Sequence, residues 1–244
     1  KNGVVVGKYS DSGAVREWQG VPFAAPPIGE LRWKAPQPVQ NWDKPLTTQW
    51  YGNSCMQGSD AFTILTKISE DCLYLNIYAP ANTTKTDLPV MIFFYGGSWK
   101  YGSAGIIYDG SEDILINEDV ILITTNYRLG VFGFLGSDAL RTRDPSGSTG
   151  NYGIQDQRAA IQWVHDNIAA FGGNPDLITI FGESAGAGSV STHLVAPRSK
   201  GMFQRAIMES GPLAQWVGMP YHYSQVKYQQ VLEYVGCNSS SVTA

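Results

Sequence analysis

The strongest constraint on the fold is an alternation of helix and strand patterns in residues 156–210. Asp156–Phe171 carries apolar residues at steps of three and four, the spacing of an amphipathic helix. Leu177–Phe181 is an apolar run of strand length, residues 184–195 form a second helix-compatible segment, and Arg205–Ser210 is another strand-length run. Strands that alternate with helices form a largely parallel sheet with helices packed on its faces. We therefore expect an α/β fold.

Earlier segments supply more strands for this sheet. Pro89–Tyr95 and Val120–Tyr127 are continuous apolar runs, which are typical of buried central strands. Cys72–Tyr78 alternates apolar and polar residues, as a half-buried strand does. Val4–Val6 and Ala14–Trp18 are short extended segments with turn residues between them, and they predict a hairpin.

Composition excludes several classes of protein. The chain has 244 residues, is 43% hydrophobic and shows no internal repeat or linker, so we expect a single domain. Its net charge is -4 and it has no basic run, which argues against a nucleic-acid partner. The longest apolar runs fall well short of the ~20 residues of a membrane span. We expect no cofactor and no metal site.

The segment between the second strand and the second helix is a candidate nucleophile turn. Gly182-Glu183-Ser184-Ala185-Gly186 matches Gly-x-Ser-x-Gly, and it lies between a strand and a helix as that motif requires. A sharp turn there presents the Ser184 hydroxyl above the edge of the sheet, and the helix N-terminus offers the Ala185 N–H to a developing oxyanion. The alternative is a glycine-rich turn that contains a serine without chemical function.

A second glycine turn follows the buried strand Pro89–Phe94. The sequence Tyr95-Gly96-Gly97-Ser98-Trp99 can present consecutive N–H groups, which would supply the other half of an oxyanion hole. By itself such a segment can be a tight turn or a bulge. Two such turns, each after a buried strand, favour a catalytic site.

Five blocks carry a resemblance to a known family: QGVPFAAPPIGELRW, SEDCLYLNIYAP, VILITTNYRLGVFGFL, GNYGIQDQRAAIQWVHDNIAAFGGNP and ITIFGESAGAGSV. In them the chain resembles the N-terminal half of the type-B carboxylesterase/lipase family, the cholinesterase-like branch of the α/β-hydrolase fold. The resemblance implies a mostly parallel central sheet with helices on both faces. It also implies that residues 1–244 are the N-terminal part of one hydrolase domain, and that the whole protein hydrolyses carboxylic esters.

The resemblance assigns roles to the two glycine turns. Ser184 would be the nucleophile, and the oxyanion donors would be the N–H groups of Gly97, Ser98 and Ala185, with Gly96 opening the loop. The family usually has a third glycine where Ser98 stands. Ser98 keeps the backbone N–H but adds a side chain, so it is expected to narrow the room for bulky substrates.

Other site residues are implied with an alternative beside each. Glu183 matches a family residue that lines the substrate pocket, but it can equally be a carboxylate favoured by the helix dipole. Trp99 and Trp216 align with aromatic residues near the acyl pocket, but either can be plain core. The resemblance also implies two structural ion pairs, Arg32 with Glu70 and Arg128 with Asp156.

Two glycosylation motifs are typical of a secreted protein, although three cysteines are an odd number for one, and we expect secretion. The resemblance pairs Cys55 with Cys72, and no tryptophan lies between them, with Phe62 at the choline-binding position of cholinesterases. This argues against a specialised choline esterase, because tryptophan binds cations best. Cys237 would pair with a cysteine outside this chain. Asn82 and Asn238 begin Asn-x-Ser/Thr sequences, for which chance occurrence is the alternative.

A catalytic histidine is harder to assign, because a serine nucleophile needs a base. His193 is nine residues after Ser184, so on one helix the two are separated by roughly 13 Å of rise. His165 falls within the predicted helix 156–171 and is expected on its surface. His222, with Glu209 as the acid, gives the one internal triad in the order that the hydrolase fold uses.

We therefore expect the acid and the histidine in a second polypeptide from the same precursor, which would hold the partner of Cys237. The family places both residues far beyond the end of this sequence. A truncated sequence is the alternative. A second alternative for function is a non-catalytic, cholinesterase-like adhesion protein, although such proteins usually lose the nucleophile that Ser184 provides.

Overall fold

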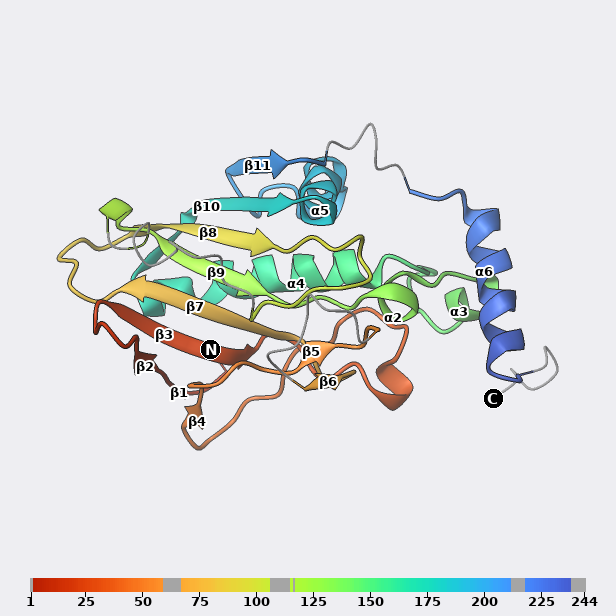
Figure 1. The fold of residues 1–244 in the computed structure, drawn as a ribbon, viewed down its shortest axis with the longest axis horizontal. Coiled ribbons are helices and arrows are strands. Elements are labelled where there is room, and N and C mark those ends of the chain that lie inside the picture. The colour runs from red at the N-terminus through yellow and green to blue at the C-terminus, as the bar shows by residue number, and fades with distance from the viewer. Residues whose placement is uncertain (1, 59–66, 106–114, 116, 212–217, 238–244) are drawn as a thin grey trace.

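A computed structural model describes residues 2–58, 67–105, 115, 117–211 and 218–237. Its centre is a seven-stranded sheet, drawn in Figure 1, with the strand order β11-β10-β8-β9-β7-β3-β2. The strands, in chain order, are β2 Lys8–Tyr9, β3 Val15–Pro22, β7 Tyr74–Pro80, β8 Leu88–Phe94, β9 Ile121–Thr125, β10 Gly173–Glu183 and β11 Arg205–Glu209.

The sheet has a parallel part and an antiparallel part. β9, β8, β10 and β11 are parallel to one another, whereas β7 is antiparallel to β9, β3 to β7 and β2 to β3. β10 and β11 are the strands that the alternating helix and strand pattern predicted, and β8 and β9 are the two continuous apolar runs. The antiparallel strands β2, β3 and β7 come earlier in the chain, and a tight turn joins β2 to β3.

Two long helices cover the parallel strands. α4, Tyr152–Asn167, joins β9 to β10 and continues into the 3-10 turn η2, Ile168–Phe171; α5, Ala185–Val195, joins β10 to β11. Both crossovers advance in the same direction along the sheet, and right-handed crossovers in one direction place their helices on one face. In the part of the chain described, the helices expected on both faces are therefore seen on one.

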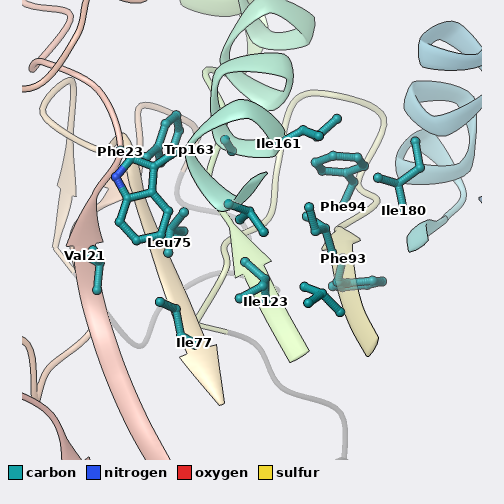
Figure 2. Close-up of a cluster of buried hydrophobic side chains, with 14 of the residues drawn as sticks. Val21, Phe23, Leu75, Ile77, Phe93, Phe94, Ile123, Ile161, Trp163 and Ile180 are labelled. Carbon is teal, nitrogen blue, oxygen red and sulfur yellow. The ribbon is translucent and has the colours of Figure 1, made fainter. Parts of the chain in front are cut away.

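The core lies between these helices and the sheet. Ile92, Ile123 and Ile180 from the strands and Ile161 from α4 are fully buried, and Figure 2 shows Ile161, Phe94 and Ile180 between helix and sheet. Apolar residues on both elements explain why these segments adopt the predicted structure. The core holds β8 and β10 side by side, and both carry a glycine turn at the carboxyl end.

The smaller elements complete the N-terminal region and the far end of the molecule. β1, Val5–Val6, pairs in parallel with β4, Leu46–Thr47, so the predicted hairpin of Val4–Val6 with Ala14–Trp18 is wrong. The hairpin instead joins β2 to β3, because a tight turn at Ser10–Ala14 allows only the residues next to it to pair. The remaining elements are η1 Gly29–Leu31, β5 Ser54–Cys55, β6 Ile68–Ser69, α2 Gly130–Phe134, α3 Asp138–Arg141, η3 Pro197–Ser199 and α6 Tyr221–Tyr234.

Candidate active site

The two glycine turns meet at one edge of the sheet. β8 and β10 are parallel neighbours, with Phe94 opposite Gly182 in the register. Their carboxyl ends therefore lie next to each other, and the chain leaves β8 into residues 95–99 and β10 into residues 184–186. This is the edge at which open α/β sheets bind their ligands.

The turn after β10 has the geometry of a nucleophile elbow. Ser184 has φ 54° and ψ -120°, a strained conformation for a residue that is not glycine. A Cβ added at Gly186 would lie 1.9 Å from the Phe94 carbonyl oxygen, and one at Gly182 would lie 2.6 Å from the Gly186 carbonyl carbon. Glycine is needed at both positions because strand and helix approach each other so closely.

The loop after β8 lies directly against the elbow. A Cβ added at Gly96 would lie 3.1 Å from the Ser184 Cβ and 2.8 Å from the Glu183 carbonyl oxygen. Gly97 and Ser98 have φ 97° and 56°, so their backbone is turned into the left-handed region. Both residues are exposed, and neither donates its N–H to an acceptor among the described residues. These N–H groups are available to an incoming oxyanion.

The Ala185 N–H is a third donor beside the nucleophile. Ala185 is the first residue of α5, and the first N–H groups of a helix have no acceptor within it. The Ser184 N–H donates to the Glu209 carbonyl at 2.8 Å, and the Ser184 carbonyl accepts from Gly188 at 3.0 Å. The two peptide groups that flank Ser184 are thus held separately, the one before it by β11 and the one after it by α5.

The sequence-predicted pocket residues divide into three cases. Glu183 is half-buried at the end of β10, and its Oε2 would lie 2.9 Å from a Cβ on Gly96, so its carboxylate borders the two turns. Trp99 is half-buried, and its indole N–H donates to the Ser189 hydroxyl at 3.0 Å. Trp216 lies outside the described residues.

A reciprocal tyrosine pair fixes the base of the loop. The Tyr127 hydroxyl donates to the Tyr95 carbonyl at 2.6 Å, and the Tyr95 hydroxyl donates to the Tyr127 carbonyl at 3.3 Å. The rings stack with centroids 4.4 Å apart. Burial raises the pKa of both hydroxyls, so they stay protonated donors. The pair joins the end of β8 to the end of β9.

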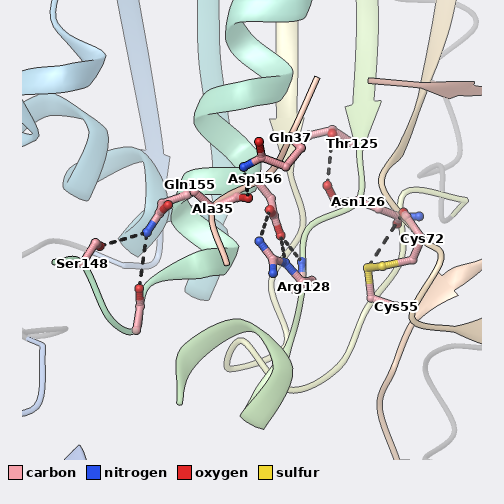
Figure 3. A network of polar contacts seen from close by, with 11 residues as sticks. Ala35, Gln37, Cys55, Cys72, Thr125, Asn126, Arg128, Ser148, Gln155 and Asp156 are labelled. Carbon is pink, nitrogen blue, oxygen red and sulfur yellow. Dashed lines mark hydrogen bonds and ion pairs between the residues drawn. A yellow bond between two sulfur atoms is a disulfide. The ribbon is translucent and has the colours of Figure 1, made fainter. Parts of the chain in front are cut away.

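The disulfide loop is tied to the same turn. Cys55 and Cys72 are bonded, as the resemblance implied, with Cα atoms 5.0 Å apart (Figure 3). Gln57 lies two residues after Cys55. Its side-chain amide accepts from the Gly102 N–H at 2.9 Å and donates to the Gly102 carbonyl at 2.9 Å. The disulfide thereby anchors the far end of the oxyanion loop. Phe62 lies outside the described residues.

Both implied ion pairs are present. The buried Arg128 guanidinium donates to both carboxylate oxygens of Asp156, at 2.8 and 2.7 Å, and Figure 3 shows this contact between the segment after β9 and α4. Arg32 pairs with Glu70, and this contact raises the pKa of the Arg32 guanidinium. Paired charges of this kind hold segments together beneath the site without facing it.

The three histidines lie away from the Ser184 hydroxyl. His193 is buried in α5, where its ring nitrogens contact Ser199 and Gln157; His165 is on the surface of α4 beside Asp166. His222 is on α6 with its ring tilted against that of Tyr223, and Figure 1 shows α6 well separated from the start of α5. The internal triad of Ser184, Glu209 and His222 is therefore wrong for this arrangement.

Sequence patterns missed three polar residues near the turns: Gln57, Gln157 and Ser189. Each is joined to its partners by side-chain hydrogen bonds over long sequence separations, which no local pattern encodes. Polar residues within an apolar helix face, such as Gln157 within α4, are the one signal that could have found them, since buried polar groups need partners.

The described residues bear on metal ligands, membrane spans, the glycosylation motifs and the third cysteine. The described residues contain no cluster of three or more potential metal ligands and no helix long and apolar enough to cross a membrane. Asn82 is exposed between β7 and β8, whereas Asn238 lies outside the described residues. Cys237 is exposed and unbonded within the described chain.

Comparison with known proteins agrees with this arrangement. Para-nitrobenzyl esterase of Bacillus subtilis (strain 168) is 44% identical over 209 residues, which are 84% of this chain and 42% of that protein. Carboxylesterase 5A of Homo sapiens is 47% identical over 208 residues, 81% of this chain and 35% of that protein. The chain thus spans less than half the length of these curated relatives.

Solved structures and a family model extend the likeness to the whole chain. A structure titled thermophylic PNB esterase has a TM-score of 0.88 at 40% identity, covering 99% of this chain and 49% of that one. The shared architecture is the α/β-hydrolase fold, as the sequence predicted. The model of the carboxylesterase family matches residues 1–244. This chain belongs to the carboxylesterase family.

Proposed function

We propose that the whole protein hydrolyses carboxylic esters, with Ser184 as the nucleophile. The observation that carries the proposal is the contact between the two glycine turns. It brings the strained Ser184 against a loop whose exposed Gly97 and Ser98 N–H groups have no acceptor among the described residues. The names of the relatives, which include esterases from bacteria and from animals, support the same class of reaction.

In the proposed reaction, the Ser184 oxygen attacks the ester carbonyl carbon as a base takes the hydroxyl proton. The negative charge that develops on the carbonyl oxygen is stabilised by the N–H groups of Gly97, Ser98 and Ala185. The C–O bond to the alcohol then breaks, and the alcohol leaves with the proton. Water attacks the acyl-enzyme by the reverse sequence and releases the acid.

The base and its acid partner are proposed to lie outside these 244 residues. Burial lowers the pKa of His193 to about 3, and both its ring nitrogens are engaged, so it cannot act as the base. His165 and His222 are placed elsewhere in the fold. A second polypeptide, joined through the exposed Cys237, would bring the missing pair to the carboxyl edge of β10.

Hydrolysis of p-nitrophenyl esters by the full-length protein tests the proposal. We expect Ser184→Ala to abolish at least about 99.9% of the wild-type rate, because little catalysis remains without the nucleophile. Ser191→Ala is the control, since Ser191 is a buried serine within α5 whose hydroxyl contacts the Met208 sulfur. Equal hydrolysis by wild type and Ser184→Ala would contradict the proposal and favour the non-catalytic adhesion protein.

Unspecialised ester hydrolysis is favoured over choline-ester hydrolysis. No tryptophan lies between Cys55 and Cys72, so the segment lacks the best cation–π partner for a quaternary ammonium group. We expect a neutral ester to be hydrolysed at least as efficiently as a choline ester of the same acid. A much higher kcat/KM on the choline ester would contradict this.

Secretion is proposed from the Cys55–Cys72 disulfide and the exposed Asn82. Disulfides persist in oxidising compartments, and an exposed Asn-Thr-Thr sequence can accept a glycan. We expect glycosidase treatment of the native protein to increase its gel mobility. Reduction should split one species into two if Cys237 joins a second polypeptide, and one unsplit band would refute that link.

A further inference from the structure

A chain of buried hydrogen bonds joins the two turns beneath the site. The Trp99 indole N–H, from the loop after β8, donates to the Ser189 hydroxyl at 3.0 Å. Ser189 is the fifth residue of α5, and its hydroxyl donates to the carbonyl of Ala185, one turn earlier, at 2.9 Å. One hydroxyl therefore connects the loop that carries Ser98 with the residue that follows the nucleophile.

The chain continues away from the site into the core. The Gln157 amide of α4 donates to Ser189 at 3.0 Å, and its oxygen accepts from His193 Nε2 at 3.1 Å. His193 Nδ1 then accepts from the Ser199 hydroxyl at 2.9 Å. Ser189, Gln157 and Ser199 are fully buried and His193 is 1% exposed, so water does not compete for these bonds.

The chemistry of the groups fixes the direction of every bond. An indole N–H and an amide NH₂ can only donate, so the Ser189 oxygen accepts two bonds and its single hydrogen must go to the Ala185 carbonyl. The Gln157 oxygen can only accept, so His193 carries its hydrogen on Nε2. Burial lowers the pKa of His193 and keeps this ring neutral. Ser189 is thus fully used, with one donor and two acceptor positions occupied.

We propose that Ser189 is a positioning residue, which sets the spacing between the oxyanion donors of the loop and the Ala185 N–H. The inference rests on the proposed function. It follows from the connections of this hydroxyl, since one side of it holds Trp99, next to Ser98, and the other holds Ala185 itself. Oxyanion donors work only at 2.7–3.1 Å from the oxyanion, and a shift of about 1 Å costs on the order of 10²-fold in rate.

The test is steady-state kinetics of the full-length Ser189→Ala variant on p-nitrophenyl butyrate. We expect kcat to fall by about 10- to 100-fold with KM within about twofold, because the oxyanion forms only after binding. Affinity for a trifluoromethyl ketone, whose adduct carries an oxyanion, should fall in proportion to kcat/KM. Active sites are counted by organophosphate titration, so that unfolded protein does not lower the apparent kcat.

A matched control separates positioning from packing. Ser191 is also a buried serine of α5, and its hydroxyl contacts the Met208 sulfur at 3.0 Å, outside the chain of bonds. We expect Ser191→Ala to keep kcat and the ketone affinity within about twofold of wild type. An equal fall in kcat and ketone affinity in both serine variants would overturn the proposal. It would show that the loss of any buried hydroxyl group from α5 lowers activity.

Trp99→Phe provides a second variant if Ser189→Ala does not fold. It keeps an aromatic ring but removes the N–H, and we expect a fall in kcat of about 3- to 10-fold. In the double variant with Ser189→Ala, Trp99→Phe should add less than twofold, since both act through one hydroxyl. Effects that multiply would overturn the proposal.

The wild type and Ser184→Ala are measured in the same assay, which separates the two claims. No ester hydrolysis by the wild type would refute the proposed function itself. Hydrolysis by the wild type, with folded Ser189→Ala equal to it in kcat and in ketone affinity, would refute only the role of Ser189.

Discussion

The elbow after β10 and the loop after β8 lie in contact, yet different forces hold them. At the elbow, backbone meets backbone, and a Cβ on Gly186 would lie 1.9 Å from the Phe94 carbonyl oxygen. The loop is held from outside by side chains, namely the Gln57 amide at Gly102, the Ser189 hydroxyl at Trp99 and the tyrosine pair at its base. Backbone packing is tightest at the first turn, whereas the second depends in addition on side-chain hydrogen bonds from distant residues.

This difference predicts two kinds of response to mutation. Backbone contacts cannot relax without moving a strand, so changes at the elbow should be severe and general. Each hydrogen bond to the loop contributes about 1 kcal/mol, so changes there should be graded and should affect rate more than folding. We therefore expect Ser184 and the Ala185 N–H to be held rigidly, and the Gly97 and Ser98 N–H groups to shift more easily.

The largest effect is expected from Gly186→Ala. Its methyl group would collide with the Phe94 carbonyl, so we expect a loss of stability of about 2–4 kcal/mol and a fall in hydrolysis above about 100-fold. Urea unfolding and ester kinetics check both. Gly218→Ala is the control, since nothing lies within 4 Å of its added Cβ. A Gly186→Ala variant as active as Gly218→Ala would show that close backbone packing does not hold the elbow.

Acidification should weaken the helix beneath the elbow through His193. Its pKa is lowered from 6.5 to about 3, first by burial and then by Arg158, and it faces Gln157, Ser199 and Phe94. Between these pH values the unfolded chain binds a proton that the folded chain does not. Stability is therefore fully present above about pH 6.5 and falls towards pH 3, by up to about 1.4 kcal/mol per unit.

Urea unfolding between pH 7 and pH 4 measures this dependence. His193→Gln is the comparison, because it removes the titrating ring while it keeps a polar side chain. The variant should be less stable at pH 7 but should lose less stability on acidification. Parallel pH profiles for the two proteins would show that His193 does not cause the loss.

A smaller effect is expected from Gln57→Ala, which removes both bonds to Gly102. We expect a loss of about 1–2 kcal/mol in stability and a few-fold fall in kcat, because the far end of the oxyanion loop loses its anchor. Gln37→Ala is the surface control, since the Gln37 amide contacts only its neighbour Ala35 among the described residues. Equal kinetics for the two variants would mean that the disulfide region does not hold the loop.

The smallest effect is expected from Ser98→Gly. Ser98 has φ 56°, a conformation that glycine adopts without strain, so stability should change by less than about 1 kcal/mol. The N–H remains and the side chain is lost, so kcat/KM for esters of bulky acids should rise relative to acetate esters. Ser98→Ala keeps a Cβ at this positive φ and so retains the backbone strain. Comparison with Ser98→Gly distinguishes relief of that strain from the extra space in the substrate pocket. An unchanged preference would refute the expected narrowing by Ser98.

The sequence predicted the parts of the site that local patterns encode. β8, β10 and α5 are apolar runs or periodic segments, and both glycine turns lie next to them, so the edge where Ser184 and Gly96 meet could be predicted. α4 begins at Tyr152, four residues before its predicted start, because its first turn is as buried as its middle.

What the sequence did not predict depends on contacts between distant residues. Trp99 meets Ser189 across 90 positions, and no periodicity records such a pair. α6 escaped notice because only Tyr228 of its residues is buried, which leaves no apolar stripe to detect. β3 and β7 were recognised as strands, but β2 was not predicted, and β1 was assigned to a hairpin that does not form because two-residue strands carry too little pattern to fix their pairing.

The most direct test of the site is covalent labelling of the full-length protein with an organophosphate. The two turns together should make Ser184 the reactive serine, so peptide mass spectrometry should find one adduct, on Ser184, at one mole per mole of protein. Labelling should fall steeply in Gly186→Ala and less in Gln57→Ala. An unlabelled Ser184, or an adduct on another serine, would contradict the account.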